Sequence, residues 1–546
     1  MTFPARRAQG DILAGLTTST VVIPKSLAYA SLAGLPLQAG LCVACFPMLA
    51  YALFGASPVL SVSSTTTIAI LTAGQVATFV PDGNVERVLA VISTLAVLTG
   101  VFLLLARLLR LGFLAEFISD PVLTGFKAGI GVVIVVDQLP KLLGLHVEKA
   151  PFVASLVQIF ERVSDAHLPT IGLSAGVIAV LYLLERFAPR APAPLIAIAA
   201  SAVVVGLLGA SEHGFALSAG VSAGFPAPIL PDLALAQVLW PGALGIALMS
   251  FTESVAAERA FAPAGTVRVP PDRELLALGA ANVVSGLLRG FPAGGGTSQT
   301  AVNARAGAAS RTAGLVTAVV AGAAMLLLAP WIRTLPQAAL AGIVVVTSLP
   351  LIAPRDFRKI LGVHRTEFLW AIAALAGVVF LGTLEGILVA VGISILSLMH
   401  QANHPSVYAV GRRASGEGFQ RVEAGESARG LPPGLLVLRT EGRVTFANAA
   451  RVGESMRALV LGARPRVVVL ECSAIPDFEY TALSALSKAQ RRLRAEGVEL
   501  WLAALNHDAE DTIRRSELKQ ALGVNGIFAS LNEAVRAYEA RARAHP

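Results

Sequence analysis

The sequence is poor in charged residues. Asp, Glu, Lys and Arg make up 14% of its 546 residues, whereas soluble proteins average about 25%. The shortage is uneven, because residues 1–400 hold 42 of the 78 charged residues and residues 401–546 hold the other 36. A purely soluble globular protein is therefore excluded. The first part has the composition of a membrane domain, and the second part has that of a soluble domain.

Cysteine and histidine are also scarce, which disfavours metal and nucleophile chemistry. The three cysteines, Cys42, Cys45 and Cys472, give no disulfide framework, and the first two fit no zinc spacing with a histidine pair. The eight histidines are scattered, and none pairs with a carboxylate at a metal-ligand spacing. The net charge of +8 is divided evenly between the two parts, so it is no signal for nucleic-acid binding. We expect no enzyme activity, no cofactor and no metal.

Long apolar runs fill residues 1–400. A membrane-spanning helix needs about 20 apolar residues, so this length allows about fourteen segments. An even number places both termini on one side, and the excess of Lys and Arg there, fifteen against six, predicts that this side is cytoplasmic. The predicted segments lie near residues 11–34, 39–55, 63–77, 85–109, 114–139, 168–187, 193–210, 234–261, 272–289, 297–307, 312–331, 337–353, 365–382 and 384–400.

Two of these segments, 63–77 and 297–307, are too short or too polar to cross a membrane alone. Such half-helices are tolerated where the adjoining irregular backbone is buried in protein or lines a cavity. One is third in the first seven segments and the other is third in the second seven. Paired interrupted segments indicate two inverted seven-segment repeats with a substrate site between them. The alternative is a pair of polar re-entrant loops without symmetry.

Both half-helices begin in segments that are rich in hydroxyl groups and glycine. The first is Ser61-Val62-Ser63-Ser64-Thr65-Thr66-Thr67, and the second is Gly294-Gly295-Gly296-Thr297-Ser298-Gln299-Thr300. A helix N-terminus has unpaired N–H groups and about half a positive charge, so two such ends facing each other predict an anion site. The alternative is close helix packing through small residues.

Ionisable residues inside membrane segments are rare and are functional candidates by default. Lys25 lies in the first segment, and Glu253 lies in the eighth, its predicted repeat partner. A carboxylate facing a cavity can take up a proton, so we expect Glu253 to couple transport to protons. The alternatives are a structural ion pair between Glu253 and a lysine, and sodium binding in place of a proton.

Residues 401–430 lack an apolar period and are predicted to be a linker. An α/β pattern follows over residues 431–546. Its predicted strands are residues 435–439, 467–472 and 498–503, and its predicted helices are residues 447–461, 481–496 and 531–542.

Several motifs resemble one family. Residues 23–36 (IPKSLAYASLAGLP) are similar to the first-helix motif of the SulP (sulfate permease) anion transporters. Gly40-Leu41, Phe54-Gly55 and Ser61-Val62 resemble the signature that follows in this family. The stretch 291–308 resembles its tenth helix, and residues 431–546 resemble the cytoplasmic STAS domain that these transporters carry.

The resemblance implies a polytopic α-helical membrane protein with fourteen segments in two inverted repeats, forming core and gate domains, and a homodimer. It also implies an anion bound between segments three and ten, with contributions from segments one and eight. On the matching positions, together with the hydroxyl-rich segments, the substrate-binding residues are Lys25, Tyr29, Ser64, Thr65, Gly296, Thr297, Ser298 and Gln299, and the coupling acid is Glu253.

Two departures from the family pattern matter. The tenth-helix motif commonly has Arg where Gln299 stands, and Gln is common where Lys25 stands, so we hypothesise that Lys25 restores the missing positive charge. In the STAS domain, Glu479 and Tyr480 replace the Asp-Ser phosphorylation position of soluble relatives, which puts a phosphorylation switch in doubt.

The sequence thus predicts a secondary-active transporter in the inner membrane of a bacterium that carries a small anion with a proton. Candidate substrates are dicarboxylates such as fumarate or succinate, sulfate and bicarbonate. Dicarboxylates are preferred, because Gln299 supplies less fixed charge than an arginine would. The expected partners are the lipid bilayer, a second copy and a cytoplasmic partner of the STAS domain. The alternatives are an uncoupled channel or exchanger, a sodium-coupled carrier, and a membrane-tethered signalling protein.

Overall fold

The chain forms two compact units, Met1–Ile395 and Leu396–Pro546. The computed structural model describes residues 4–116, 119–147, 152–188, 191–209, 214–218, 224–262, 269–413, 418–422, 430–523 and 526–544.

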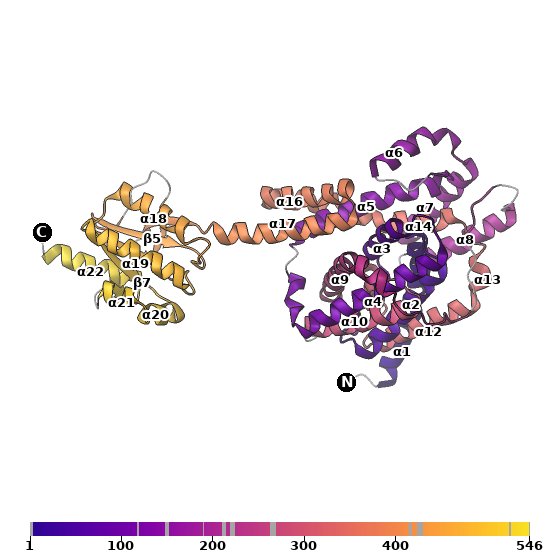
Figure 1. Ribbon diagram of the computed structural model, residues 1–546, viewed down its shortest axis with the longest axis horizontal. Coiled ribbons are helices and arrows are strands. Elements are labelled where there is room, and N and C mark those ends of the chain that lie inside the picture. Colours follow the sequence, from indigo (N-terminus) through magenta and orange to yellow (C-terminus); the bar gives the residue numbers. More distant parts are fainter. Residues whose placement is uncertain are drawn as a thin grey trace. The chain divides into compact units, whose positions relative to one another are not determined.

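The first unit is a bundle of helices, in which α2, α4, α9 and α10 pack closely (Figure 1). The last helix, α17, continues past the boundary into the second unit. The helices are α1 (Pro4–Leu32), α2 (Leu37–Phe54), α3 (Thr66–Phe79), α4 (Val85–Leu108), α5 (Asp120–Leu143), α6 (Phe152–Glu161), α7 (Leu168–Phe187), α8 (Ala193–Leu208), α9 (Leu233–Phe261), α10 (Pro271–Leu287), α11 (Thr297–Arg305), α12 (Thr312–Leu327), α13 (Ala329–Ile332), α14 (Gln337–Ile352), α15 (Pro354–Val363), α16 (Arg365–Ala376) and α17 (Thr383–Asn403).

Each predicted segment overlaps at least one of these helices, and segment 312–331 covers both α12 and α13. The start of α1 differs most from the prediction, at Pro4 rather than residue 11. Helix α5 begins at Asp120 because Pro121 occupies its first turn, where a missing N–H removes no helical hydrogen bond. Among the described residues, six helices are long and apolar enough to cross a membrane. The half-helices α3 and α11 are short, at 14 and 9 residues, as their sequences indicate.

Small residues bring the helices of this unit into close contact. A Cβ on Gly125 of α5 would lie 1.9 Å from the carbonyl oxygen of Ala371 in α16. A Cβ on Gly100 of α4 would lie 2.6 Å from the carbonyl oxygen of Gly279 in α10. Side chains would hold these backbones apart, so the glycines permit the dense packing that helices use in membranes.

Two short strands join the two halves of the bundle. Strand β1 (Val62–Ser63) pairs antiparallel with β2 (Gly294–Gly295), with Val62 opposite Gly295 and Ser63 opposite Gly294. Each strand leads directly into a half-helix, β1 into α3 and β2 into α11. The pairing therefore places the N-termini of the two half-helices next to each other.

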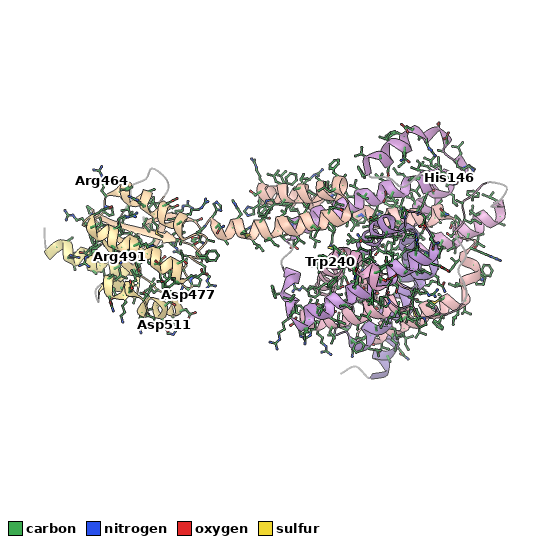
Figure 2. All side chains as sticks on the ribbon, in the orientation of Figure 1. His146, Trp240, Arg464, Asp477, Arg491 and Asp511 are labelled. Carbon is green, nitrogen blue, oxygen red and sulfur yellow. The ribbon has the colours of Figure 1, made fainter. Side chains whose placement is uncertain are left out.

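The second unit contains a six-stranded sheet in the order β4-β3-β5-β6-β7-β8. Strands β5 to β8 are parallel, and their apolar side chains form a core on each face of the sheet. Figure 2 shows charged side chains such as Arg464 and Arg491 on its surface. The elements are β3 (Val407–Arg412), β4 (Phe419–Arg421), β5 (Leu435–Thr440), α18 (Ala449–Ala463), β6 (Val467–Glu471), α19 (Tyr480–Ala495), β7 (Glu499–Ala503), α20 (His507–Arg514), α21 (Glu517–Leu522), β8 (Ile527–Phe528) and α22 (Leu531–Ala544).

The linker predicted at residues 401–430 is wrong in part. Its described residues include β3 and β4, and β3 pairs antiparallel with β5 along Val407–Val410. Val410 is 4% exposed and belongs to one of the two cores of this unit. Residues 414–417 and 423–429 lie outside the described residues. The short strands escaped prediction because Gly, Ser and Arg surround them, and a two-stranded addition carries little apolar periodicity of its own.

Candidate functional site

The two half-helices begin differently. The side chain of Thr65 caps α3 by accepting a hydrogen bond from the Ile68 backbone N–H at 3.2 Å. The N-cap of α11 is Gly296, which has no side chain to do this, and Thr297 and Ser298 in its first turn are exposed. The open end of α11 therefore presents backbone N–H and hydroxyl groups that can donate hydrogen bonds to an anion.

Side chains of α11 fix the segment that precedes α3. Gln299 donates from Nε2 to the carbonyl oxygen of Ser61 at 3.0 Å, and its Oε1 accepts from the Ser63 hydroxyl at 3.1 Å. The backbone N–H of Ser61 donates to the Thr300 hydroxyl at 3.2 Å, and Gly296 N–H donates to the Ser61 carbonyl at 3.2 Å. The start of each half-helix thus depends on the other.

Glu253 of α9 lies at the N-terminus of α3. Its carboxylate accepts hydrogen bonds from the hydroxyls of Thr65 at 3.0 Å and Thr67 at 2.7 Å, and the residue is 7% exposed. A negative charge at a helix N-terminus is stabilised by the helix dipole. Among the described residues, no ion pair involves Glu253, so its observed contacts are with threonines rather than with a lysine.

Helix α1 contacts both half-helices through two residues one turn apart. Lys25 donates from Nζ to the Ser298 hydroxyl at 2.9 Å, which brings a positive charge to the first turn of α11. The hydroxyl of Tyr29 accepts from Thr66 at 2.9 Å in the first turn of α3. Residues i and i+4 lie on one helix face, so a single face of α1 spans the two N-termini.

Two serines of α9 hold the second strand. The Gly295 N–H donates to the Ser254 hydroxyl at 2.7 Å, and the Ser250 hydroxyl donates to the carbonyl oxygen of Ala293 at 2.7 Å. Sequence reasoning missed both residues. Their spacing of four, on either side of Glu253, was the available signal, because it places them on one face of the helix.

Most of the predicted site residues therefore lie around the two N-termini. The first turns of the half-helices are contacted by Lys25, Tyr29, Thr65 and Glu253, and the start of α11 is formed by Gly296, Thr297 and Ser298.

Two predicted site residues have a different setting. Gln299 is 2% exposed and is bonded to Ser61 and Ser63, while Ser64 is 1% exposed and donates to the Thr65 backbone at 3.5 Å. The sequence had not assigned roles to Thr66 and Thr67, although both lie in the hydroxyl-rich run.

A helical membrane unit in which paired strands lead into two half-helices, with a lysine and a carboxylate at the half-helix N-termini, is typical of a membrane transporter. The chain belongs to the sulfate permease family, whose sequence profile matches residues 8–374. The profile of the STAS domain matches residues 431–534. The family consists of anion transporters, so the chain is not an enzyme.

Related proteins match along nearly the whole chain. A protein of Mycobacterium tuberculosis named "Probable sulfate transporter" is 34% identical over 99% of this chain and 97% of its own length. The chloroplastic sulfate transporter 4.1 of Arabidopsis thaliana is 26% identical over 96% of this chain and 79% of its own length.

Solved structures share the fold. The murine anion transporter solute carrier 26 family member A9, in an inward-facing state, has a TM-score of 0.88 with 20% identity, over 97% of this chain and 91% of the other. The transmembrane domain of a cyanobacterial bicarbonate transporter has a TM-score of 0.63 with 24% identity, over 72% of this chain and 98% of the other. At these identities the likeness concerns the fold alone.

Proposed function

We propose that this chain is a proton-coupled symporter of a small dianion, which binds between the N-termini of α3 and α11. The observation that carries the proposal is the uncapped N-terminus of α11, with Lys25 bonded to Ser298 in its first turn. Gly296, Thr297 and Ser298 supply donors there, and Tyr29 and Thr65 complete the site from α1 and α3.

A count of charges supports coupling to a proton. Lys25 contributes one positive charge, the ionised Glu253 contributes one negative charge, and each helix N-terminus contributes about half a positive charge. The site then has a net charge of about +1, and protonation of Glu253 raises it to about +2. A dianion is neutralised only by the protonated site, so anion and proton bind together.

The same count separates the candidate substrates. Sulfate and the dicarboxylates fumarate and succinate are dianions, and they require the proton. Bicarbonate is a monoanion, which the ionised site neutralises without one. The relatives named as sulfate transporters favour sulfate as the first substrate to test. The preference for dicarboxylates that Gln299 suggested is tested in the same assay.

Lys25 takes the role of the arginine that the family motif commonly has at the position of Gln299. The contact with Ser298, the residue before Gln299, supports this substitution of one cation for another. The inward-turned amide of Gln299 supports it too, because a buried amide bonded to β1 is not placed at the open end of α11.

The charge bias of the loops supports the orientation of the chain, and its family supports the rest of the proposed setting. We place the chain in the inner membrane of a bacterium, with both termini in the cytoplasm, as a homodimer of fourteen-segment protomers with inverted repeats. Alternating access of the core domain relative to the gate domain would expose the site to each side in turn. A cytoplasmic partner of the STAS domain is a further element of this proposal.

The test is uptake of labelled sulfate, fumarate and bicarbonate into proteoliposomes, each with and without an inward proton gradient. We expect the gradient to stimulate uptake of a dianion and to leave bicarbonate uptake unchanged. If no anion responds to the gradient, the symport proposal is wrong. A sodium gradient applied in the same vesicles would then separate a sodium-coupled carrier from an exchanger or channel.

A further inference from the structure

Helix α10 contacts the segments that precede both half-helices, although it contributes nothing to the site described above. Residues 55–61 lead into β1 and α3, and residues 290–293 lead into β2 and α11. One buried polar residue near the start of α10 holds the first segment, and another buried polar residue two turns later holds the second. Glu274 and Asn282 are 1% and 0% exposed.

Glu274 holds the segment before α3. The Tyr51 hydroxyl of α2 donates to both carboxylate oxygens of Glu274, each at 2.9 Å, and accepts from the Ser57 N–H at 3.3 Å. The Ser57 N–H belongs to irregular backbone, whose polar groups must find internal partners in a membrane. Glu274 therefore holds this segment through Tyr51.

Asn282 holds the segment before α11 in a corresponding way. Its side-chain amide accepts from the Ala293 N–H at 2.9 Å and donates to the Ala293 carbonyl at 3.0 Å. One side chain therefore satisfies both backbone polar groups of a single buried residue.

The two anchors are eight residues apart on one rigid helix, which corresponds to about 12 Å along its axis. The segment held by Glu274 continues to Ser61, where α11 binds it, and the segment held by Asn282 continues to Gly295, where α9 binds it. Helix α10 thereby fixes the origin of each half-helix relative to the other.

We infer that Glu274, Tyr51 and Asn282 are positioning residues for anion binding. These residues hold the irregular segments before α3 and α11, and so they set the distance between the N-termini of the two half-helices. The anion binds at these N-termini and does not touch α10. The inference rests on the proposed function for its transport readout. If one of these residues is replaced, the distance between the two N-termini becomes more variable. Both N-termini then contribute less to anion binding, although Lys25 and Glu253 remain in the site.

The first experiment compares sulfate uptake by Glu274→Gln, Tyr51→Phe and the control Glu86→Gln in proteoliposomes. Glu86 is an exposed acid in the first turn of α4, as Glu274 is in the first turn of α10, so the control removes a helix-start charge without an anchor. For Glu274→Gln we expect KM to rise roughly tenfold, the effect of one buried hydrogen bond left unmade, with the maximal rate nearly unchanged. Tyr51→Phe should raise KM at least as much, because it leaves both the Glu274 carboxylate and the Ser57 N–H without this partner, and Glu86→Gln should leave KM unchanged.

The second experiment needs no transport and separates this inference from the proposed function. Spin labels at Thr78 and Arg305, exposed residues at the far ends of α3 and α11, report the distance between the half-helices without any anion. We expect Glu274→Gln to broaden this distance distribution and Glu86→Gln to leave it unchanged. An unchanged distribution with an unchanged KM would overturn the inference, even if the variant protein melted at a lower temperature. A wild-type protein that takes up no anion would overturn the proposed function alone.

Discussion

Single residues decide the charge of the candidate site. Lys25 and Glu253 come from different helices, and each contacts the first turn of a different half-helix, α11 for the lysine and α3 for the acid. The hydroxyls around Glu253 can donate to its ionised form, and they can accept from its protonated form by rotating. The carboxyl group can therefore change its charge without a change of partners.

Replacing Glu253 by Gln fixes the site in a state like the protonated one. We expect anion counterflow to persist and stimulation by an inward proton gradient to disappear, because no group is left to release the proton. The measurement is labelled anion uptake with and without the gradient in the same vesicles. A Glu253→Gln protein that still responds to the gradient would place the coupling residue elsewhere, and a channel would conduct equally well with either residue.

Replacing Lys25 by Gln removes the positive charge at the start of α11. A hydrogen bond to a charged group contributes about 1.5–3 kcal/mol, so we expect the apparent affinity for a dianion to fall roughly ten- to a hundredfold. Lys25→Arg, which keeps the charge, is the control and should retain more affinity. Equilibrium binding of sulfate to the purified protein measures the effect. Normal affinity in Lys25→Gln would reject the idea that this lysine replaces the family's arginine.

At the scale of elements, the β1–β2 pair holds the half-helices together, and it depends on glycine. A Cβ on Gly295 would lie 2.7 Å from Cδ1 of Leu60 and 2.9 Å from Cα of Ser254. A backbone Cα cannot move away as a flexible side chain can. The close approach of α9 to β2, and with it the hydrogen bond from Gly295 to Ser254, requires the absence of a side chain.

Gly295→Ala should therefore lower both thermal stability and uptake. Overpacking a closely packed site typically costs about 1–3 kcal/mol, and the displaced strand carries the start of α11 with it. Gly172→Ala is the matched control, because no atom lies within 4 Å of the new Cβ on α7. Melting in detergent and anion uptake are measured for both variants. Equal behaviour of the two variants would mean that the β2 contact tolerates a methyl group.

At the scale of the whole molecule, the chain consists of a transport unit and a second unit with its own two-sided core. Strand β3 belongs to this second unit, since it covers the edge of β5 and buries Val410. With β3 and β4 in place, the edge of the sheet is the three-residue β4 instead of the six-residue β5, and a short edge strand is less prone to aggregation.

Two fragments of the second unit test this assignment. We expect residues 396–546 to unfold cooperatively, and residues 431–546 to be less stable by at least about 1.5 kcal/mol, because the shorter fragment loses the burial of Val410 as well as the β3 ladder. Thermal unfolding followed by circular dichroism provides the comparison. Equal stability would show that β3 adds nothing to the stability of this unit.

Much of the organisation was predictable from local sequence. Apolar length located the helices, and composition separated the two units, because the preference of a segment for lipid or water depends on its own residues. The hydroxyl-rich starts of α3 and α11 and the acid Glu253 were evident for the same reason. Strands β3 and β4 were missed, since two short strands in a polar stretch carry too little periodicity.

The sequence by itself determined which segments are helical, which are too short to cross a membrane and which residues have the chemistry to bind an anion. Only the tertiary structure decided how these residues meet. Lys25 contacts a serine 273 positions away, Glu253 contacts threonines nearly 190 positions away, and Gln299 turns inward to β1. The physical reason is that helix formation and lipid preference are local properties, whereas contacts between distant residues depend on the packing of the whole bundle.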